Sequence, residues 1–176
     1  MVFKETAVKG AYLVELDPRG DIRGFFARAW CSKEFETQGL KPKMVQANTS
    51  FNKYKGTLRG LHYQAYSKPE AKFMRCIRGR IYDVLVDLRP ESPTFKKWVG
   101  VELTAENRLA LYVPEQCAHG YLSLEDGSEV LYLVSEFYSP ECERGIRYDD
   151  ASIKIDWPIA IEHISEKDLA WALLEK

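Results

Sequence analysis

The segment GTLRGLHYQ, residues 56–64, has the pattern that decides the fold of this chain. Its side chains favour a β-strand, and glycines stand at Gly56 and Gly60. The same segment carries His62, and a histidine on a rigid strand suits a general base because imidazole titrates near neutrality. Most single histidines are instead packed and hydrogen-bonded, so the rest of the chain has to decide between these interpretations.

The composition is that of an ordinary globular protein. The chain has 176 residues, of which 45% are hydrophobic and 29% charged, enough for one domain with a sizeable core. The formal net charge of −1 excludes a broad basic surface of the kind that binds nucleic acid or anionic membranes. An anionic ligand would therefore need a local cluster of basic residues.

The four cysteines are scattered without a CxxC spacing, at positions 31, 76, 117 and 142. This argues against a zinc site and against a disulfide framework, and favours reduced thiols. Residues 1–6 show no apolar run of signal-peptide length, and no later segment is long enough to span a bilayer. We therefore expect a cytoplasmic protein.

Turn signals recur at short intervals, which predicts an all-β sandwich or barrel. We expect a turn at 17–21, a strand at 24–30, a short helix from Ser32 stopped at Gly39, and a last strand at 153–157. The strands 72–78 and 80–89 flank Gly79 and have the signature of a hairpin. A period of two in 80–89 places residues 82, 84 and 86 on one face and 81, 83, 85 and 87 on the other.

The tail differs from the rest. Ser165 to Asp168 fits an acidic capping box and precedes a predicted short helix at 169–174. The whole pattern predicts one mainly-β domain, a jelly roll of antiparallel strands with short peripheral helices, spanning residues 1–176.

Strict alternation along the first segment would point Arg59 away from the face that carries His62. Either Gly60 holds a bulge that re-aims one of them, or Arg59 serves a different wall of a pocket.

An ordered series of short motifs covers nearly the whole chain: GDIRGFF at 20–26, LRGLHYQ at 58–64, DVLVDLR at 83–89 with SPTF at 92–95, VP at 113–114, AHG at 118–120, EVLY at 129–132, YSP at 138–140, RGI at 144–146, WP at 157–158 and SEKD at 165–168. Each motif is weak alone, but their order and spacing are highly specific. In these motifs the chain resembles the dTDP-4-dehydrorhamnose 3,5-epimerases, a branch of the cupins.

The resemblance implies a double-stranded β-helix jelly roll, a homodimer with exchanged N-terminal strands, and a nucleotide-linked 4-keto-6-deoxyhexose as substrate. It implies neither metal nor nicotinamide, and a place in deoxysugar or polysaccharide biosynthesis. By position, His62 corresponds to the general base, Asp168 to its orienter, Tyr132 to the acid on the opposite face and Lys72 to the cation beside the ketone. The positions that contact the nucleotide sugar are Arg23, Phe26, Gln46, Asn48, Arg59, His119, Tyr138, Glu143 and Lys167.

These residue types suit that chemistry. Removing a proton next to a ketone places charge on the oxygen, so the reaction needs a base at carbon and a cation or donor at oxygen. An acid on the opposite face then returns a proton and inverts the centre. The basic residues together would form a local pocket for a diphosphate on a nearly neutral protein.

Each of these residues also has a purely structural interpretation. Lys72 suits a solvated strand start, Tyr132 a core tyrosine, and His119 a turn. Asp168 suits a capping acid, a role that competes with orienting His62 for the same oxygens. Arg23, Arg59 and Lys167 suit a charged surface.

Three positions depart from the family pattern. Arg28 stands where a glutamate contacting the nucleoside is typical, Glu70 where glutamine is expected, and Leu133 where lysine is usual. The nucleotide therefore stays open between dTDP and CDP, GDP or UDP, as does inversion at C3, C5 or both.

Two rival functions come from other classes. A metal cupin needs clustered histidine and carboxylate ligands, whereas the first segment reads His-Tyr-Gln rather than His-x-His and the chain has three histidines in all. A sugar-nucleotide-binding jelly roll without activity would be expected to lack His62, Tyr132 or Asp168, and all three are present.

Overall fold

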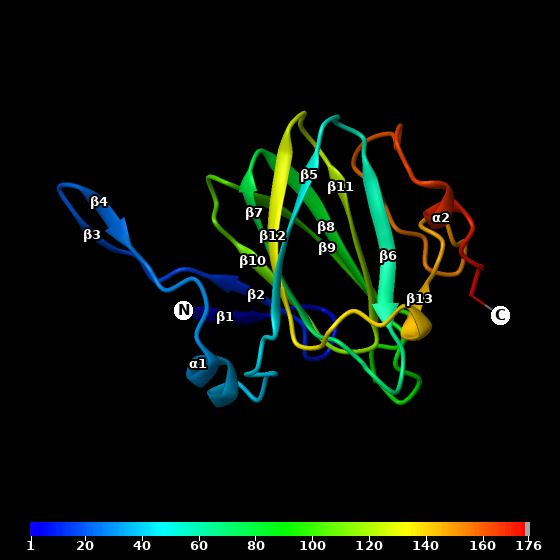
Figure 1. Cartoon of the computed structure of the whole chain (residues 1–176), viewed down its shortest axis with the longest axis horizontal. Helices are drawn as coiled ribbons and strands as arrows, with labels where there is room; N and C mark the ends of the chain where they lie inside the picture. Colours follow the sequence, from blue (N-terminus) through cyan, green and yellow to red (C-terminus); the bar gives the residue numbers. More distant parts are fainter. Residues whose placement is uncertain (175–176) are drawn as a thin grey trace.

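A computed structural model describes residues 1–174 as two facing antiparallel sheets with peripheral segments at both ends (Figure 1). The six-stranded sheet has the order β1 (Val2–Glu5), β2 (Tyr12–Glu15), β10 (Ala110–Val113), β7 (Lys72–Arg78), β12 (Ser128–Val134) and β5 (Gln46–Asn52). The five-stranded sheet has the order β13 (Glu143–Gly145), β6 (Leu58–Gln64), β11 (Cys117–Ser123), β8 (Arg80–Asp87) and β9 (Trp98–Thr104). The predicted mainly-β jelly roll is confirmed.

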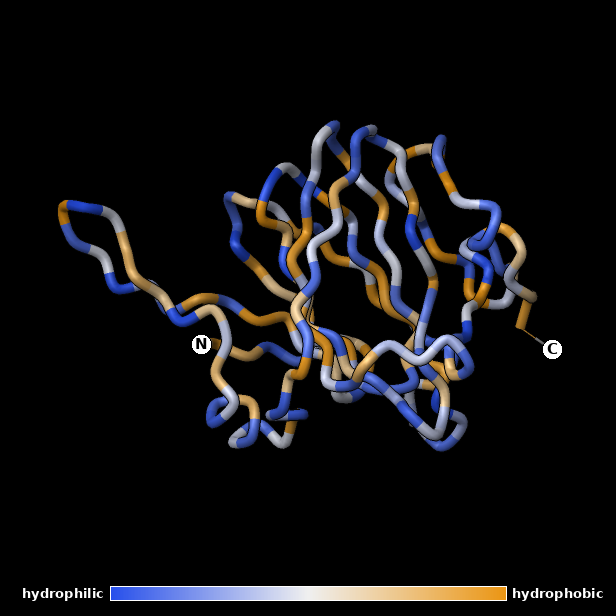
Figure 2. Tube along the Cα trace, viewed as in Figure 1, coloured by the Kyte–Doolittle hydropathy of each residue, from blue (hydrophilic) through white to orange (hydrophobic). Residues whose placement is uncertain are grey.

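Alternation along the strands builds the core, and Figure 2 shows hydrophobic and hydrophilic residues alternating along the chain. On β8, Ile81 and Leu85 enter the cluster between the sheets, whereas Val84 and Val86 enter a second cluster on the outer face. The predicted assignment of faces is confirmed. The C-terminal segment covers that outer face with Ile153 and other apolar residues, so both faces of β8 are buried.

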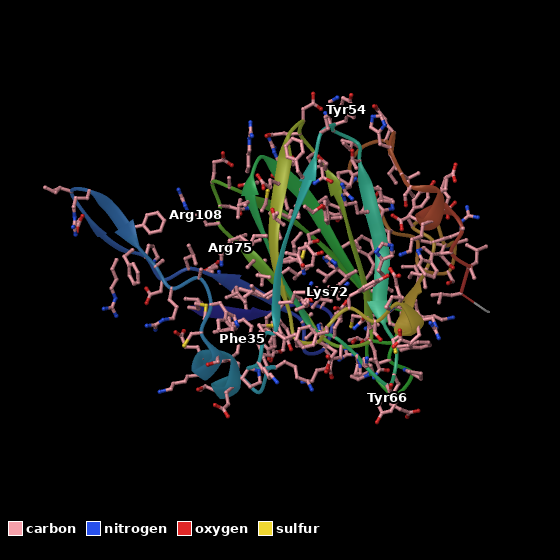
Figure 3. The ribbon with its side chains drawn as sticks, viewed as in Figure 1. Phe35, Tyr54, Tyr66, Lys72, Arg75 and Arg108 are labelled. Carbon is pink, nitrogen blue, oxygen red and sulfur yellow. The ribbon has the colours of Figure 1, made fainter. Side chains whose placement is uncertain are left out.

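The outer face of the six-stranded sheet is covered at one end by helix α1 (Ser32–Thr37). Phe35 is fully buried there, and its ring lies edge-on to Phe73 at 5.0 Å between centroids (Figure 3). Gly39 follows the helix with a φ of +70°, so the predicted glycine stop is confirmed. Cys31, rather than Ser32, occupies the N-cap.

Five local predictions are wrong. The turn expected at 17–21 contains β3 (Arg19–Asp21), which pairs with β4 (Gly24–Phe26), and the strand expected to reach residue 30 ends at Phe26. The strands flanking Gly79 form no hairpin, because β7 lies in one sheet and β8 in the other. Gly79, with a φ of +69°, makes a corner between sheets that is packed against Ser128.

The other two corrections concern the C-terminal segment. Residues 153–157 are not a strand, since their apolar side chains cover the five-stranded sheet without joining its edge. Helix α2 (Glu166–Leu169) ends where the predicted helix would begin. A short 3-10 helix spans Pro140–Cys142. Within residues 1–174, no helix has the length and apolarity needed to cross a bilayer.

Candidate active site

A pocket of about 470 Å³ opens between the two sheets. The five-stranded sheet and the segment leading into α2 supply one wall, and the six-stranded sheet supplies the other. The lining residues are Ser50, Thr57, Leu58, Arg59, His62, Lys72, Met74, His119, Gly120, Tyr121, Tyr132, His163, Ile164, Ser165, Lys167 and Asp168. All four predicted catalytic residues are therefore brought into one pocket, together with the predicted binding residues Arg59, His119 and Lys167.

His62 and Asp168 form a hydrogen-bonded pair on the first wall. Nε2 of His62 lies 2.5 Å from Oδ1 of Asp168. The histidine side chain is partly exposed to the pocket, whereas the carboxylate is buried. An Nε2–H that donates to this carboxylate leaves Nδ1 as the basic nitrogen, which is the arrangement of a general base with its orienter.

The capping role of Asp168 does not compete with this pair. The backbone N–H of Asp168 donates to Oγ of Ser165, which caps α2, while its carboxylate accepts from His62 and from the backbone N–H of Gly60. Burial by itself raises the pKa of Asp168, but the hydrogen bond and charge of His62, with the bonds from Gly60 and Ser165, lower it below the ordinary value. The carboxylate is therefore ionised when His62 accepts a proton.

Tyr132 and Lys72 lie on the opposite wall. They come from the neighbouring strands β12 and β7, and their side chains face the interior of the sandwich. Burial, followed by the nearby Tyr121 and Glu70, raises the pKa of Tyr132, so its phenol keeps the proton that an acid needs. Nζ of Lys72 donates to the backbone carbonyl of His62 at 3.3 Å, which places the ammonium between the two walls (Figure 3).

A bulge brings Arg59 and His62 to the same face. His62 pairs with His119 and Arg59 pairs with Tyr121, so two residues of β6 oppose the single Gly120 of β11. Gly60 has a φ of +121°, and a Cβ on it would lie 2.6 Å from Cα of Gly120. The bulge interpretation is confirmed, and both side chains line the pocket.

A second histidine–carboxylate pair lies deeper in the pocket. Nε2 of His119 lies 2.7 Å from Oδ1 of Asp83, and both side chains are buried. His119 is a strand residue of β11 and not the turn residue of the alternative interpretation. Sequence reasoning placed Asp83 on the same face of its strand as Ile81 and Leu85 without assigning it a role. A carboxylate that alternates with these apolar residues is the signal that could have identified it.

The predicted binding residues Glu143, Tyr138 and Lys167 form a network beside the pocket. Nζ of Lys167 lies 2.6 Å from Oε1 of Glu143, and the hydroxyl of Tyr138 donates to Oε2 of the same carboxylate at 2.7 Å. Lys167 lines the pocket, whereas Glu143 and Tyr138 do not. Gln46 and Asn48 pair with Val134 and Tyr132 on the edge strand β5, outside the pocket lining, and bond to each other at 2.8 Å.

The structure does not bring Arg23 and Phe26 to the pocket. Both belong to the β3–β4 hairpin, which projects away from the sandwich in Figure 1, and Phe26 is 72% exposed. Arg23 bonds to Asp21 within the hairpin. The hairpin rests on the sandwich through Arg108, whose guanidinium lies 5.0 Å from the ring centroid of Phe25.

The three departures from the family pattern have distinct surroundings. Arg28 lies 3.1 Å from Glu34 of α1, away from the pocket. Leu133 faces outward and packs against the cluster around Phe35. Glu70 forms an ion pair with Lys72 inside the sandwich. Sequence reasoning also missed His163 as a lining residue, although it is one of only three histidines and stands two residues before the capping box.

The histidine and carboxylate side chains of the pocket were also candidates for metal ligands. Among residues 1–174, no three histidine, cysteine, aspartate or glutamate side chains are grouped as metal ligands. Two of the pocket histidines, His62 and His119, bond to a carboxylate through Nε2 instead.

The chain is similar to proteins of known function. The family model described as dTDP-4-dehydrorhamnose 3,5-epimerase matches residues 5–176. The chain is 45% identical over 166 residues to the enzyme of that name from Shigella flexneri, covering 94% of this chain and 91% of that protein. It is 43% identical to the enzyme of that name from Methanothermobacter thermautotrophicus, covering 99% and 95%. This chain belongs to the dTDP-4-dehydrorhamnose 3,5-epimerase family.

Solved structures of the dTDP-4-dehydrorhamnose 3,5-epimerase family have the same fold. The crystal structure from Elizabethkingia anophelis superposes with a TM-score of 0.96 at 39% identity, covering 98% of this chain and 96% of that one. The structure from Bacillus anthracis, with TDP and pyrophosphate bound, gives a TM-score of 0.92 at 40% identity, covering 98% and 100%. The resemblance noted in the sequence is confirmed, as are the cupin-type jelly roll and the assignment to the epimerases, which are isomerases.

Proposed function

We propose that this chain inverts C3 and C5 of a dTDP-linked 4-keto-6-deoxyhexose by removing the proton next to the ketone and returning one on the opposite face. The observation that carries the proposal is the placement of the His62–Asp168 pair and of Tyr132 on opposite walls of one pocket. A planar enolate held between these walls meets a base on one face and an acid on the other, so the centre inverts.

Each group has a defined task in this reaction. Nδ1 of His62 takes the proton from carbon, and the Asp168 carboxylate stabilises the resulting imidazolium. The Lys72 ammonium stabilises the charge that develops on the ketone oxygen. Tyr132 delivers its phenolic proton to carbon and regains one before the next turnover. Because His62 takes one proton from carbon and Tyr132 returns a different one, solvent hydrogen enters the product.

The nucleotide arm of the substrate requires cations at the mouth of the pocket. Arg59 and Lys167 line it, and a diphosphate binds well to such groups. We assign the remaining predicted contacts to this arm: Gln46, Asn48, His119, Tyr138 and Glu143. The nucleoside is dTDP in this proposal, which the Bacillus anthracis relative with bound TDP supports.

Arg23 and Phe26 require a second copy of the chain. The exposed hairpin that carries them projects from the sandwich (Figure 1), as a segment that reaches a neighbouring protomer would. In our proposal the protein is a homodimer, and each hairpin completes the pocket of its partner. We further propose that residues 1–176 form a single domain, located in the cytoplasm and serving deoxysugar and polysaccharide biosynthesis.

The test is proton exchange in D₂O, followed by NMR. The protein is incubated with dTDP-4-keto-6-deoxyglucose and, in parallel, with the CDP, GDP and UDP sugars. The proposal predicts loss of the C3 and C5 proton signals with dTDP sugar. Loss of one signal would make the protein a single-centre epimerase, and exchange confined to another nucleotide would contradict the assignment of dTDP. No exchange with any sugar would favour a binding protein without activity.

A further inference from the structure

A buried carboxylate, which the proposed mechanism does not use, lies beside the Lys72 ammonium. Oε1 of Glu70 lies 3.1 Å from Nζ of Lys72, and the two side chains are only 11% and 12% exposed. An ion pair so little exposed interacts strongly, because solvent screens it poorly. Glu70 is also the position where glutamine was expected, so this chain carries an additional negative charge at the reaction centre.

The other charged groups around Lys72 do not duplicate this contact. Within the described residues 1–174, Glu70 is the carboxylate within 4 Å of the Lys72 ammonium. The remaining titratable groups that face the pocket are Arg59 and His62 on β6, His119 and Tyr121 on β11, Tyr132 on β12, His163 in the segment before α2, and Lys167 and Asp168 on α2. Asp168 is bonded to His62, and Glu143 to Lys167, so neither carboxylate balances Lys72.

We propose that Glu70 is a positioning residue that holds the Lys72 ammonium in place and directed at the ketone oxygen. This inference rests on the proposed function for its role in catalysis. Nζ of Lys72 is held between Oε1 of Glu70 and the carbonyl oxygen of His62, two acceptors that fix its place. A charged acceptor holds the ammonium more strongly than a neutral one does.

A second group supports this role. Glu70 is one of the groups that raise the pKa of Tyr132, after burial and Tyr121. The Glu70 carboxylate therefore acts on both Lys72 and Tyr132, which lie on the wall opposite His62. Tyr132 must be protonated for the proposed reaction, so Glu70 extends activity toward alkaline pH.

The test separates charge from position. Glu70→Gln keeps a carbonyl oxygen as acceptor for Lys72 but removes the negative charge, whereas Glu70→Asp keeps the charge. The first readout needs no substrate: acetic anhydride acylates free amines, and mass spectrometry gives the rate at Lys72. At one fixed pH we expect Lys72 to react severalfold faster in Glu70→Gln, because its amine is no longer held in a charged ion pair, and close to the wild-type rate in Glu70→Asp.

The matched control is Glu15→Gln, which removes the carboxylate paired with Lys4 on the exposed edge of the sandwich. Lys72 should react in this variant as in the wild type. An unchanged Lys72 rate in Glu70→Gln, or an equal rise in Glu15→Gln, would overturn the inference. If the wild type fails to exchange the sugar protons, the proposed function fails, and the acylation rates still decide whether Glu70 protects Lys72.

The second readout is the pH profile of kcat. The alkaline loss of activity should begin at a lower pH in Glu70→Gln, because the charge that helps to raise the pKa of Tyr132 is gone, and should remain in place in Glu70→Asp. A purely structural role would lower kcat at every pH and leave the shape of the profile unchanged, which would contradict the inference.

Discussion

At the scale of single residues, the pocket depends on pairs in which one side chain determines what the other can do. Asp168 does so for His62, and Glu70 does so for Lys72. A histidine without its carboxylate would have neither a fixed tautomer nor a partner for its charged form. The sequence places the partners 106 and 2 positions apart, so only the second pair is local.

Asp168→Asn tests the first pair. The neutral amide cannot stabilise the imidazolium of His62 as the carboxylate does. We therefore expect kcat to fall about 10²- to 10⁴-fold while KM changes little. Circular dichroism should show that the fold is intact. Wild-type turnover in this variant would contradict the assignment of Asp168 as the orienter.

The same substitution has a pH signature in stability. Because the pKa of Asp168 is lower in the folded protein than its ordinary value, ionised Asp168 stabilises the fold above the ordinary carboxyl pKa. That contribution is lost as the pH falls through the folded value. The free energy of unfolding of wild-type protein, measured by urea titration, should therefore decline more steeply in acid than that of Asp168→Asn.

At the scale of elements, the bulge in β6 brings two side chains to one wall of the pocket, and the loop at 88–97 joins the paired strands β8 and β9. The strand that carries His62, the alternation along 80–89 and the helix stop at Gly39 could be predicted, because each follows from local spacing. The crossing between sheets at Gly79 could not, because a glycine with positive φ suits a hairpin and a corner equally well. The segment 153–157 reads as a strand because burial against a sheet selects the same apolar residues.

Gly60→Ala tests the bulge. Its φ of +121° and the 2.6 Å approach of a Cβ to Gly120 combine backbone strain with a steric clash. We expect the free energy of unfolding to fall by about 2 kcal/mol or more, and activity to fall with it.

Gly39→Ala is the control: its φ is +70°, but its Cβ would lie in open space. Its expected loss is about 1 kcal/mol, with activity unchanged. Equal losses in the two variants would contradict the packing argument.

Asp87→Asn tests the loop that joins β8 and β9. This fully buried carboxylate accepts bonds from Arg89, Ser92 and Thr94, which outweigh the effect of burial and lower its pKa to about 2. The ionised form therefore stabilises the fold by about 2 kcal/mol at neutral pH, and this is lost between about pH 4 and pH 2. Urea unfolding should show that loss in the wild type and not in Asp87→Asn. Identical acid profiles would contradict it.

At the scale of the whole molecule, the catalytic residues converge within one protomer, whereas Arg23 and Phe26 remain outside it. The convergence could be predicted only through the family resemblance, since His62, Lys72, Tyr132 and Asp168 come from four separate elements. Local patterns carry no information on which faces of those elements will meet.

Mixing two inactive variants tests whether the hairpin acts in the partner's pocket. His62→Ala lacks the base, and Arg23→Ala lacks the hairpin contact. If Arg23 acts in trans, a dimer formed from one of each has one complete pocket. Unfolding and refolding an equal mixture should then recover about a quarter of wild-type activity, because half of the dimers are mixed and each has one working site. Recovery no greater than the sum of the two variants would show that the hairpin does not complete the partner's site.

The central claim is that His62 and Tyr132 act on opposite faces of one enolate. Its most direct test is to follow deuterium and configuration together at C3 and C5 of the sugar, by NMR in D₂O, in wild type, His62→Ala and Tyr132→Phe. We predict deuterated, inverted product from the wild type and no deuterium incorporation from His62→Ala. Tyr132→Phe should incorporate deuterium with retained configuration, because only protonated His62 is left to return it. Inverted product formed by Tyr132→Phe at the wild-type rate would contradict the account.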